Sequence, residues 1–302
     1  MTDYSQAERN GGGVLHVIAT PIGNLEDFAP RARELLAAAD FVAAEDTRHS
    51  GRLLKRFGIA TPLVSLHEHN EAQRAPQLVA RLQEGERGAL VSDAGTPLVS
   101  DPGYRLLRLA REAGISVSPV PGPCAAIAAM SVAGLPSDRF TFEGFLPPKQ
   151  AARRRRLEAL AEEPRAMLFY ESPRRVAATL EDMVAVLGAG REATCARELT
   201  KLHETVAHGT LAALHAQAVA DERWRLGEFV LVVAGAPAAA ADDGAGHEAR
   251  RVLSLLLDDG ISPKQSAALA AKITRGSRNS LYRLALELHQ GDRDGDEPPV
   301  AP

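Results

Sequence analysis

Short apolar runs alternate with longer amphipathic stretches, and this alternation is the feature that most constrains the fold. Runs with the composition of β-strands lie at 14–20, 40–46, 61–66, 88–93 and 116–120. Helix candidates fill the intervals at 30–38, 48–57, 71–84 and 103–113. Strands that alternate with helices form a largely parallel sheet covered by helices, so this part of the chain is predicted to be an α/β domain.

The pattern changes near residue 121. Further strand candidates lie at 139–147, 166–172, 192–199, 204–211 and 228–235, and fewer helices separate them, at 154–162, 174–187 and 210–219. Neighbouring strands without a helix between them indicate antiparallel pairs in a mixed sheet. We therefore expect an N-terminal α/β domain over 14–121 and a C-terminal α/β domain over 122–237.

The last part of the chain has a different composition. Residues 238–247 are low in complexity and predict a linker. Three short helical stretches with tight turns follow, which predicts a helix-turn-helix-like module over 248–290. The polar ends at 1–13 and 291–302 are expected to be disordered.

Composition limits the functional classes. The net charge is only −4, so any nucleic-acid binding has to come from local basic patches. Neither an apolar signal core at the N-terminus nor an apolar run of membrane-spanning length is present. Cys124 and Cys195 lie among small apolar residues, which suits a reducing compartment. We expect a cytoplasmic protein.

Three predicted strand ends carry glycine and proline turns: "ATPIGN" at 19–24, "SDAGTP" at 92–97 and "PVPGPCAA" at 119–126. Ligands of α/β proteins bind beyond the carboxyl ends of the strands, and glycine lets a ligand approach the backbone closely. The chain has no GxxxxGK[ST] phosphate loop, and its "GGG" precedes a strand instead of following one. These turns predict a site for a ligand without a triphosphate.

Together, the motifs "VIATPIGNLEDFAPRARE", "LVSDAGTPLVSDPGYRL", "PVPGPCAAIAAMSVAGLPSDRFTFEGFLP", "FYESPRR" and "ARELTKLHE" resemble the tetrapyrrole methylase superfamily. They are most similar to its branch that methylates the ribose 2′-hydroxyl of a cytidine in 16S rRNA of the 30S subunit. The resemblance implies a class III methyltransferase whose two α/β domains hold S-adenosylmethionine in the cleft between them. It also implies a homodimer.

The resemblance implies a cofactor site built from the three turns and from two positions of the second domain. Asp93 and Gly95 would line the pocket, and Tyr170 with the "AGAP" turn would close over the adenine. No metal is assigned. The implied cofactor-binding residues are Thr20, Pro21, Gly23, Asn24, Asp93, Ala94, Gly95, Thr96, Pro97, Pro121, Gly122, Pro123, Cys124, Tyr170 and Ala236.

A ribose hydroxyl is a poor nucleophile, so a group that takes its proton would assist methyl transfer. Candidates are Glu45, Asp46 and Asp101, together with Lys201 and its neighbours Glu198 and Glu204. The alternative role for each of these residues is a structural ion pair or a helix cap. The sequence leaves open which of them acts as a base, and whether any does.

Two basic clusters are candidates for RNA contact, although a run of charges is usually a solvated helix face. The first comprises Arg48, Arg52, Lys55 and Arg56, which share one helix face, and the second comprises Lys149, Arg153, Arg154, Arg155 and Arg156. An RNA substrate requires phosphate neutralisation, which a tetrapyrrole does not. We therefore favour an rRNA methyltransferase over a tetrapyrrole C-methyltransferase, and both over a non-enzymatic RNA-binding protein.

Overall fold

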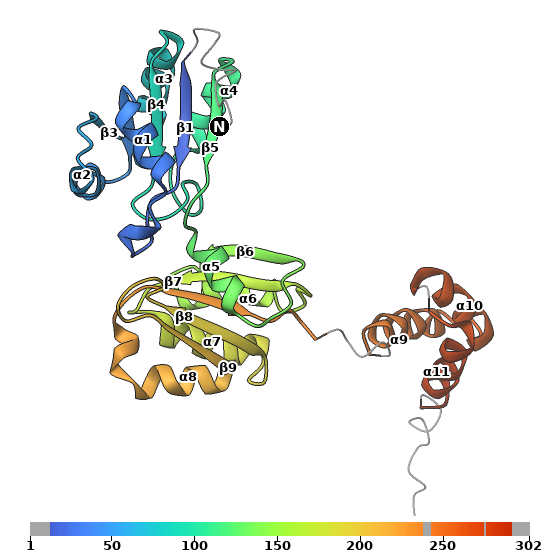
Figure 1. Cartoon of the computed structure of the whole chain (residues 1–302). Helices are drawn as coiled ribbons and strands as arrows, with labels where there is room; N and C mark the ends of the chain where they lie inside the picture. Colours follow the sequence, from blue (N-terminus) through green and yellow to red (C-terminus); the bar gives the residue numbers. More distant parts are fainter. Residues whose placement is uncertain (1–12, 238–242, 275, 292–302) are drawn as a thin grey trace, which may run out of the picture. The chain divides into compact units, whose positions relative to one another are not determined.

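The computed structural model describes residues 13–237, 243–274 and 276–291. The chain divides into two compact units at Gly235–Ala236. The first unit contains two five-stranded sheets with helices, and the second consists of helices (Figure 1). This confirms the predicted fold class, with two α/β domains and a C-terminal helical module. Of the ends predicted at 1–13 and 291–302 and the linker predicted at 238–247, residues 1–12, 238–242 and 292–302 lie outside the described residues, whereas Gly291 is the last residue of a helix. The domain boundaries stay predictions.

The first sheet is entirely parallel, with the order β3-β2-β4-β1-β5. Its strands are β1 (Val14–Ile18), β2 (Phe41–Ala44), β3 (Leu63–Ser65), β4 (Arg87–Val91) and β5 (Ser116–Val120). Because all five run the same way, their carboxyl ends meet at one edge. The three glycine turns follow β1, β4 and β5 at that edge.

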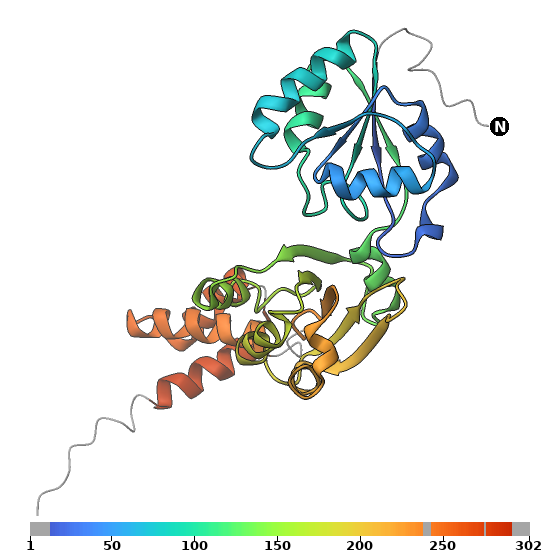
Figure 2. The ribbon, with the colours of Figure 1, turned by 90° about the vertical axis from the view of Figure 1, so that its left-hand side faces the viewer.

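Helices cover both faces of this sheet (Figure 2). The four main helices are α1 (Pro30–Ala38), α2 (Thr47–Arg56), α3 (Glu71–Gln83) and α4 (Tyr104–Glu112). Strand β2 shows why both faces need cover, since none of its residues is polar. Phe41 and Ala43 pack among α3 and α4 residues, whereas Val42 and Ala44 pack among residues of α1 and α2. A strand buried on both faces is typical of a parallel sheet.

The second sheet is mixed, as its sequence predicts, with the order β6-β7-β10-β8-β9. Only β6 and β7 pair in parallel, and the other pairs are antiparallel. The strands are β6 (Phe140–Phe145), β7 (Ala166–Glu171), β8 (Glu192–Arg197), β9 (Thr205–Thr210) and β10 (Phe229–Val233).

One face of this sheet packs on α5 (Ala125–Val132), and the other packs on α6 (Gln150–Glu158), α7 (Val176–Leu187) and α8 (Leu211–Ala220). Helix α6 begins at Gln150, four residues before the predicted start at 154. Its N-cap, Lys149, follows Pro147 and Pro148, which cannot occupy a helix interior. The earlier start brings Arg153 into the helix.

Strand β6 contains a bulge, at which two of its residues oppose one residue of β7. Phe142 pairs with Leu168, and the next pair is Gly144 with Phe169, so Glu143 is the extra residue. Gly144 has φ +62°, a left-handed conformation that glycine adopts without strain. The register shift decides which face of the sheet the following residue, Phe145, occupies.

The C-terminal unit contains α9 (Asp243–Asp258), α10 (Pro263–Thr274) and α11 (Arg278–Gly291). Its core gathers small and branched side chains, including Leu253, Ala267 and Leu281. Helix α9 starts at Asp243, so residues 243–247 of the predicted linker are helical. Among the described residues, no helix combines the length and the apolar character needed to cross a membrane.

Candidate active site

A cavity of about 390 Å³ lies at the carboxyl edge of the first sheet, and residues of both α/β domains line it. Its volume falls within the range of about 300–1,000 Å³ that is typical of small-molecule sites. The first sheet and its turns contribute Ile22, Glu45, Asp93, Ala94, Gly95, Thr96, Val99, Ser100 and Asp101. The rest of the lining is Ala125, Phe145, Tyr170, Glu171, Ser172, Pro173, Ala196, Leu199, Glu228, Phe229 and Val230.

The "SDAGTP" turn is fixed by hydrogen bonds to the other two glycine turns. The backbone N–H of Thr20 donates to Gly95 O at 2.9 Å, and the N–H of Gly95 donates back to Thr20 O at 3.1 Å. Thr96 Oγ1 donates to Pro123 O at 2.9 Å. Gly95 has φ +85°, and a Cβ at this position would lie 3.1 Å from a methyl group of Ile22. The turn therefore presents its backbone in a held conformation that suits glycine.

Three carboxylates, those of Glu45, Asp93 and Asp101, line the same cavity. Asp93 Oδ1 accepts the backbone N–H of Asp46 at 3.1 Å. Burial and the nearby Asp93 raise the pKa of Glu45. Burial is also the largest cause for Asp101, whose pKa rises to about 7, with Glu45 and Asp93 adding to the rise and a hydrogen bond to Ser92 opposing it. Asp101 can therefore exchange a proton near neutral pH.

The loop that holds Asp101 has an unusual backbone. Leu98 and Ser100, on either side of Val99, have φ of 74° and 73°. Such conformations cost free energy in residues other than glycine, and they persist where the surroundings enforce them. Gly103, with φ 125°, then ends the loop as the N-cap of α4. The loop therefore holds Asp101 at the cavity, before α4 begins.

Two of the other candidate bases have structural partners. Asp46 is the N-cap of α2, and its Oδ1 accepts the N–H of Arg48 at 2.7 Å, which lowers its pKa. Lys201 Nζ donates to Glu198 at 2.8 Å and to Glu228 at 3.0 Å. Burial acts to lower the pKa of Lys201, but these two contacts outweigh it and the pKa is raised. Lys201 is therefore held protonated and cannot accept a proton, and neither residue lines the cavity.

Of the implied cofactor-binding residues, Asp93, Ala94, Gly95, Thr96 and Tyr170 line the cavity. Thr20 and Pro123 do not line the cavity, but they hold the "SDAGTP" turn by the hydrogen bonds described above. Tyr170 Oη also accepts the N–H of Ala126 at 3.2 Å. Pro21, Pro97, Pro121, Gly122 and Cys124 belong to the same three turns without lining the cavity.

Gly23 and Asn24 connect the two α/β domains. A Cβ on Gly23 would lie 2.4 Å from Cγ of Lys201, so only glycine leaves room for that side chain. The N–H of Asn24 donates to Thr200 Oγ1 at 3.1 Å, and its side chain caps the 3-10 helix Leu25–Asp27. Gly23 and Asn24 therefore lie at the contact between the "ATPIGN" turn and the segment that follows β8.

The prediction that Ala236 closes over the adenine is wrong for this cavity. Strand β10 runs antiparallel to β7, and its first residue, Phe229, pairs with Glu171 at the cavity. Ala236 comes three residues after the last residue of β10, Val233, and therefore lies past the other end of the strand. The cavity meets the beginning of β10 instead.

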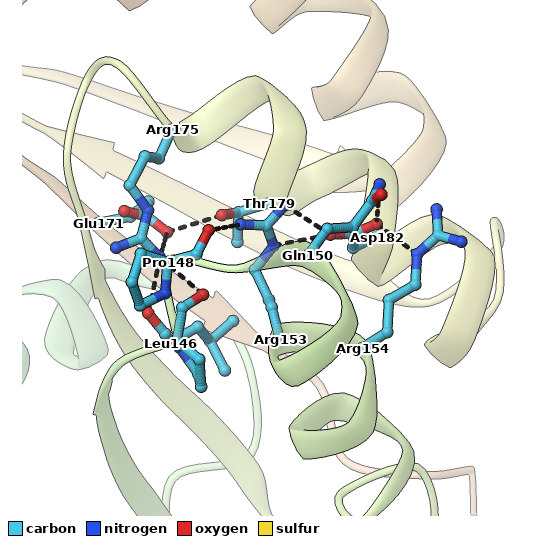
Figure 3. A network of polar contacts seen from close by, with 10 residues as sticks. Leu146, Pro148, Gln150, Arg153, Arg154, Glu171, Arg175, Thr179 and Asp182 are labelled. Atoms are coloured by element: carbon cyan, nitrogen blue, oxygen red, sulfur yellow. Dashed lines mark hydrogen bonds and ion pairs between the residues drawn. The ribbon is translucent and has the colours of Figure 1, made fainter.

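The two basic clusters differ in the structure. Arg48, Arg52, Lys55 and Arg56 are exposed on α2, and within the described residues none of them forms an ion pair. In the second cluster, the side chain of Arg153 is only 5% exposed, and its Nε and Nη2 both donate to Asp182 at 2.6 Å (Figure 3). The prediction that Arg153 contacts RNA is therefore wrong, because its guanidinium is buried against a carboxylate.

The neighbours of Arg153 are partly available to solvent. Arg154 also donates to Asp182, at 2.6 Å, with a 42% exposed side chain. Arg156 pairs with Glu143. Lys149 and Arg155 are exposed, and within the described part of the chain neither forms an ion pair. Within the described residues, Lys149 and Arg155 are therefore the two members of the second cluster whose charges have no ion-pair partner.

Much of the second domain's share of the cavity was not foreseen. Glu171 is the last residue of β7, and Ser172 and Pro173 follow the strand as Asp93 follows β4, so the strand-end rule that located Asp93 could have located them too. Glu228 lies at the start of a strand, and it reaches the cavity only because β10 is antiparallel to β7. Phe145 reaches it because of the bulge in β6.

No group of three or more His, Cys, Asp and Glu side chains within 13–237, 243–274 and 276–291 has an arrangement that could hold a metal ion. The carboxylates of Glu45, Asp93 and Asp101, which follow the strands of the first sheet, favour a cationic ligand in the cavity. The shape and charge of the site suit a small, partly apolar ligand that carries a positive charge.

Two α/β domains that share one cavity define a class of methyltransferase. The family described as "Tetrapyrrole (Corrin/Porphyrin) Methylases" matches residues 14–215, and the chain belongs to this family. The helices at the end match a second description, "RsmI C-terminal HTH domain", over residues 243–289. Solved structures agree with the fold: the uroporphyrin-III-C-methyltransferase of Thermus thermophilus has a TM-score of 0.52 at 20% identity, covering 74% of this chain and 94% of its own.

More similar proteins are named ribosomal RNA small subunit methyltransferase I. The one from Pseudomonas aeruginosa is 54% identical over 275 residues, covering 91% of this chain and 97% of its own length. The one from Escherichia coli O157:H7 is 54% identical over 282 residues, covering 93% and 98%. The one from Synechocystis is 47% identical over 276 residues, covering 91% and 98%.

Proposed function

We propose that the protein transfers the methyl group of S-adenosylmethionine to the ribose 2′-hydroxyl of a cytidine in 16S rRNA of the small ribosomal subunit. The observation that carries the proposal is the 54% identity, over 91% of the chain, to a protein named ribosomal RNA small subunit methyltransferase I. The cavity supports it, because the lining combines backbone turns, carboxylates and an apolar wall.

The residues present fit S-adenosylmethionine. The carboxylates of Asp93 and Glu45 favour a cationic ligand in a half-buried site, where charges interact more strongly than in water. Ala196 and Val230, which share the α5 face of the second sheet, form a buried apolar wall suited to an adenine ring. When bound, this cofactor supplies a methyl carbon activated by a positively charged sulfur atom.

Asp101 is the residue that the geometry favours as the proton acceptor. Its pKa of about 7 means that a large fraction is ionised at neutral pH, while the carboxylate is still basic enough to take a proton. Glu45, whose pKa is also raised, lies in the same group and keeps the pKa of Asp101 high by repulsion. The held turn at 92–97 orients the reactants, and positioning of this kind supplies much of the acceleration in a displacement with a good leaving group.

RNA phosphates would meet the exposed face of α2 with Arg48, Arg52, Lys55 and Arg56. This helix begins at Thr47, and its N-cap Asp46 directly follows Glu45, so its basic face starts next to the cavity carboxylates. Lys149 and Arg155 of the second cluster are the remaining candidates for phosphate contact. The homodimer implied by the resemblance stays a prediction, which the mass in solution by light scattering tests.

The proposal is tested by methyl transfer from radiolabelled S-adenosylmethionine to three substrates in parallel. These are unmodified 30S subunits, naked unmodified 16S rRNA and a tetrapyrrole precursor. We expect label on the 30S subunit or the rRNA, at a ribose 2′ position of a cytidine. Label on the tetrapyrrole alone would overturn the proposal in favour of carbon methylation. Bound cofactor without transfer to any substrate would instead indicate a non-enzymatic RNA-binding protein.

A further inference from the structure

Phe145 is a large apolar side chain that lines the cavity and remains 55% exposed. We propose that its ring is the platform on which the base of the acceptor nucleotide stacks during methyl transfer. The inference rests on the proposed function and adds to it a residue that positions the substrate. Four features of the structure support it: the face that the ring occupies, the contacts that hold it, its separation from the cofactor wall and its closeness to Asp101.

The bulge in β6 places the ring at the cavity. Along the paired stretch, Phe140 faces Ala166, Phe142 faces Leu168 and Phe145 faces Tyr170, so all three aromatic residues share one face of the sheet. Without the extra residue at Glu143, Phe145 would fall on the opposite face, where α6 and α7 pack. The glycine at 144, with φ +62°, makes this change of register possible.

The ring contacts Tyr170, and two arginines hold the backbone that follows it. Its centroid lies 5.6 Å from that of Tyr170 in an edge-to-face contact. Arg175 Nη2 donates to Leu146 O at 2.6 Å, directly after Phe145 in the chain (Figure 3). Arg153 Nη1 donates to Pro148 O at 3.3 Å. Two arginines therefore fix the backbone that follows the ring, which reduces the entropy lost when a ligand stacks on it.

Phe145 is separate from the wall that suits the cofactor. Ala196 and Val230 pair across β8 and β10 on the face of the sheet that carries α5, and at 1% and 5% exposed they form an inner, fully buried surface for one flat ring. Phe145 is the exposed apolar surface of the same cavity, open to a ligand that arrives from solvent.

The ring also lies close to the candidate base. A Cβ built on Gly144 would be 3.3 Å from Ser100 Oγ, so the β6 bulge lies next to the residue that precedes Asp101. A nucleotide with its 2′-hydroxyl at Asp101 would therefore have its base within reach of Phe145. Proteins that act on single nucleotides of RNA hold the unstacked base against an aromatic ring, because every base presents a flat π-face.

The test compares Phe145→Leu with Phe145→Tyr and with the control Phe140→Leu. Phe140 is on the same strand and 37% exposed, but it does not line the cavity. Loss of a stacked ring is expected to raise KM for 30S subunits or rRNA roughly tenfold or more, while Phe145→Tyr keeps the activity and Phe140→Leu has no effect. The Kd for S-adenosylmethionine, measured by calorimetry, is expected to stay unchanged in all three variants.

Other outcomes would overturn the inference. A weakened affinity for S-adenosylmethionine with unchanged KM for RNA would assign the ring to the cofactor. If Phe145→Leu changes neither the Kd for S-adenosylmethionine nor the KM for RNA, the ring binds neither ligand. If the unaltered protein methylates no RNA, the proposed function fails and the inference fails with it; if it is active and Phe145→Leu is equally active, only the inference fails.

A direct readout covers the case in which Phe145→Leu folds poorly. A short RNA with a fluorescent cytidine analogue at the acceptor position is expected to change its emission on binding to the unaltered protein and to Phe145→Tyr, because stacking alters the emission of such bases. The change should be absent with Phe145→Leu. The same change with Phe145→Leu that binds RNA would contradict stacking on this ring.

Discussion

Asp101 and Asp182 are both carboxylates removed from bulk water, yet they are held in opposite ways. Asp182 is fully buried and has Arg153 and Arg154 beside it. Burial acts to raise its pKa, but the hydrogen bonds from these arginines outweigh burial and the pKa is lowered. Asp101 is half-buried beside Glu45 and Asp93, and its pKa rises to about 7. The charges of the neighbours decide whether a buried acid is structural or able to exchange protons.

The same contrast extends to the basic helices. Helix α6 places Arg153 and Arg154 against Asp182, whereas α2 keeps its basic residues in solvent and forms no ion pair with Glu45, Asp93 or Asp101. The second domain therefore uses its arginines for stability. The first domain keeps acids at the cavity and bases on the surface, an arrangement that suits the proposed cationic cofactor and anionic substrate.

The largest expected effect is on the rate of Asp101→Asn. Asparagine keeps the shape of the side chain but cannot take a proton, so kcat is expected to fall about 10²- to 10⁴-fold. The unaltered protein should show kcat rising with pH through about 7, and the variant should lose this dependence. Single-turnover methyl transfer over a pH series measures both quantities, and an unchanged rate would place Asp101 among the structural acids.

The second prediction concerns Asp182→Ala, which leaves the buried Arg153 without its partner. Removing one member of a buried ion pair costs about 3–5 kcal/mol, so the free energy of unfolding in urea should fall by that amount. Arg154→Ala is the matched control, because this side chain is 42% exposed, and it should cost far less. Equal losses for the two variants would mean that Arg153 finds another acceptor.

Asp93→Ala tests whether the cavity acids act on the cofactor. Loss of a hydrogen-bonding charge should weaken the binding of S-adenosylmethionine by about 1.5–3 kcal/mol. Calorimetry gives the Kd, and Asp182→Asn serves as a comparison, since Asp182 does not line the cavity. An unchanged Kd for Asp93→Ala would remove this residue from the cofactor site.

The sequence reveals those parts of the molecule that depend on local pattern. Strands and helices follow from periodicity, and Asp93 and Gly95 were located because an acid and a glycine follow a predicted strand. The pKa of Asp101 could not be foreseen, because it depends on the convergence of three segments that end in Glu45, Asp93 and Asp101. Nor could the sequence separate Arg153 from Arg155, since both belong to one run of arginines and only the packing of α6 against α7 distinguishes them.

The face of Phe145 illustrates the same limit. Strict alternation along β6 would place Phe145 on the face of the sheet opposite to that of Phe142. The single extra residue in the bulge moves Phe145 to the same face as Phe142. The glycine in "FEGF" is compatible with a bulge, but it does not fix where the register shifts. Sites that depend on register, strand direction and ion pairing are therefore the ones that required the structure.

Neutralising charges on the two basic helices sharpens the comparison between them. Arg52→Gln with Lys55→Gln on α2 should weaken RNA binding and lower the slope of log K against log salt by about 0.7 for each phosphate that the helix no longer neutralises. Arg154→Gln on α6 should leave the slope unchanged, because this arginine already pairs with Asp182. Filter binding at several salt concentrations measures both, and an unaltered slope for the α2 variant would make that helix face a solvated surface.

The smallest expected effect is on the pH dependence of stability. The pKa of Asp101 is about 7 in the folded protein and about 3.9 when unfolded, so its contribution to stability is present below the unfolded value and is lost as pH rises through about 7. The lowered pKa of Asp182 has the opposite sign, and its contribution is lost as pH falls. Between about pH 4 and about pH 8, Asp101→Asn should therefore gain stability relative to the unaltered protein as pH rises. Solvent screening keeps the gain modest, because Asp101 is half-exposed. Urea unfolding across this range measures the difference, and a difference that stays constant with pH would show that Asp101 titrates like an ordinary surface acid.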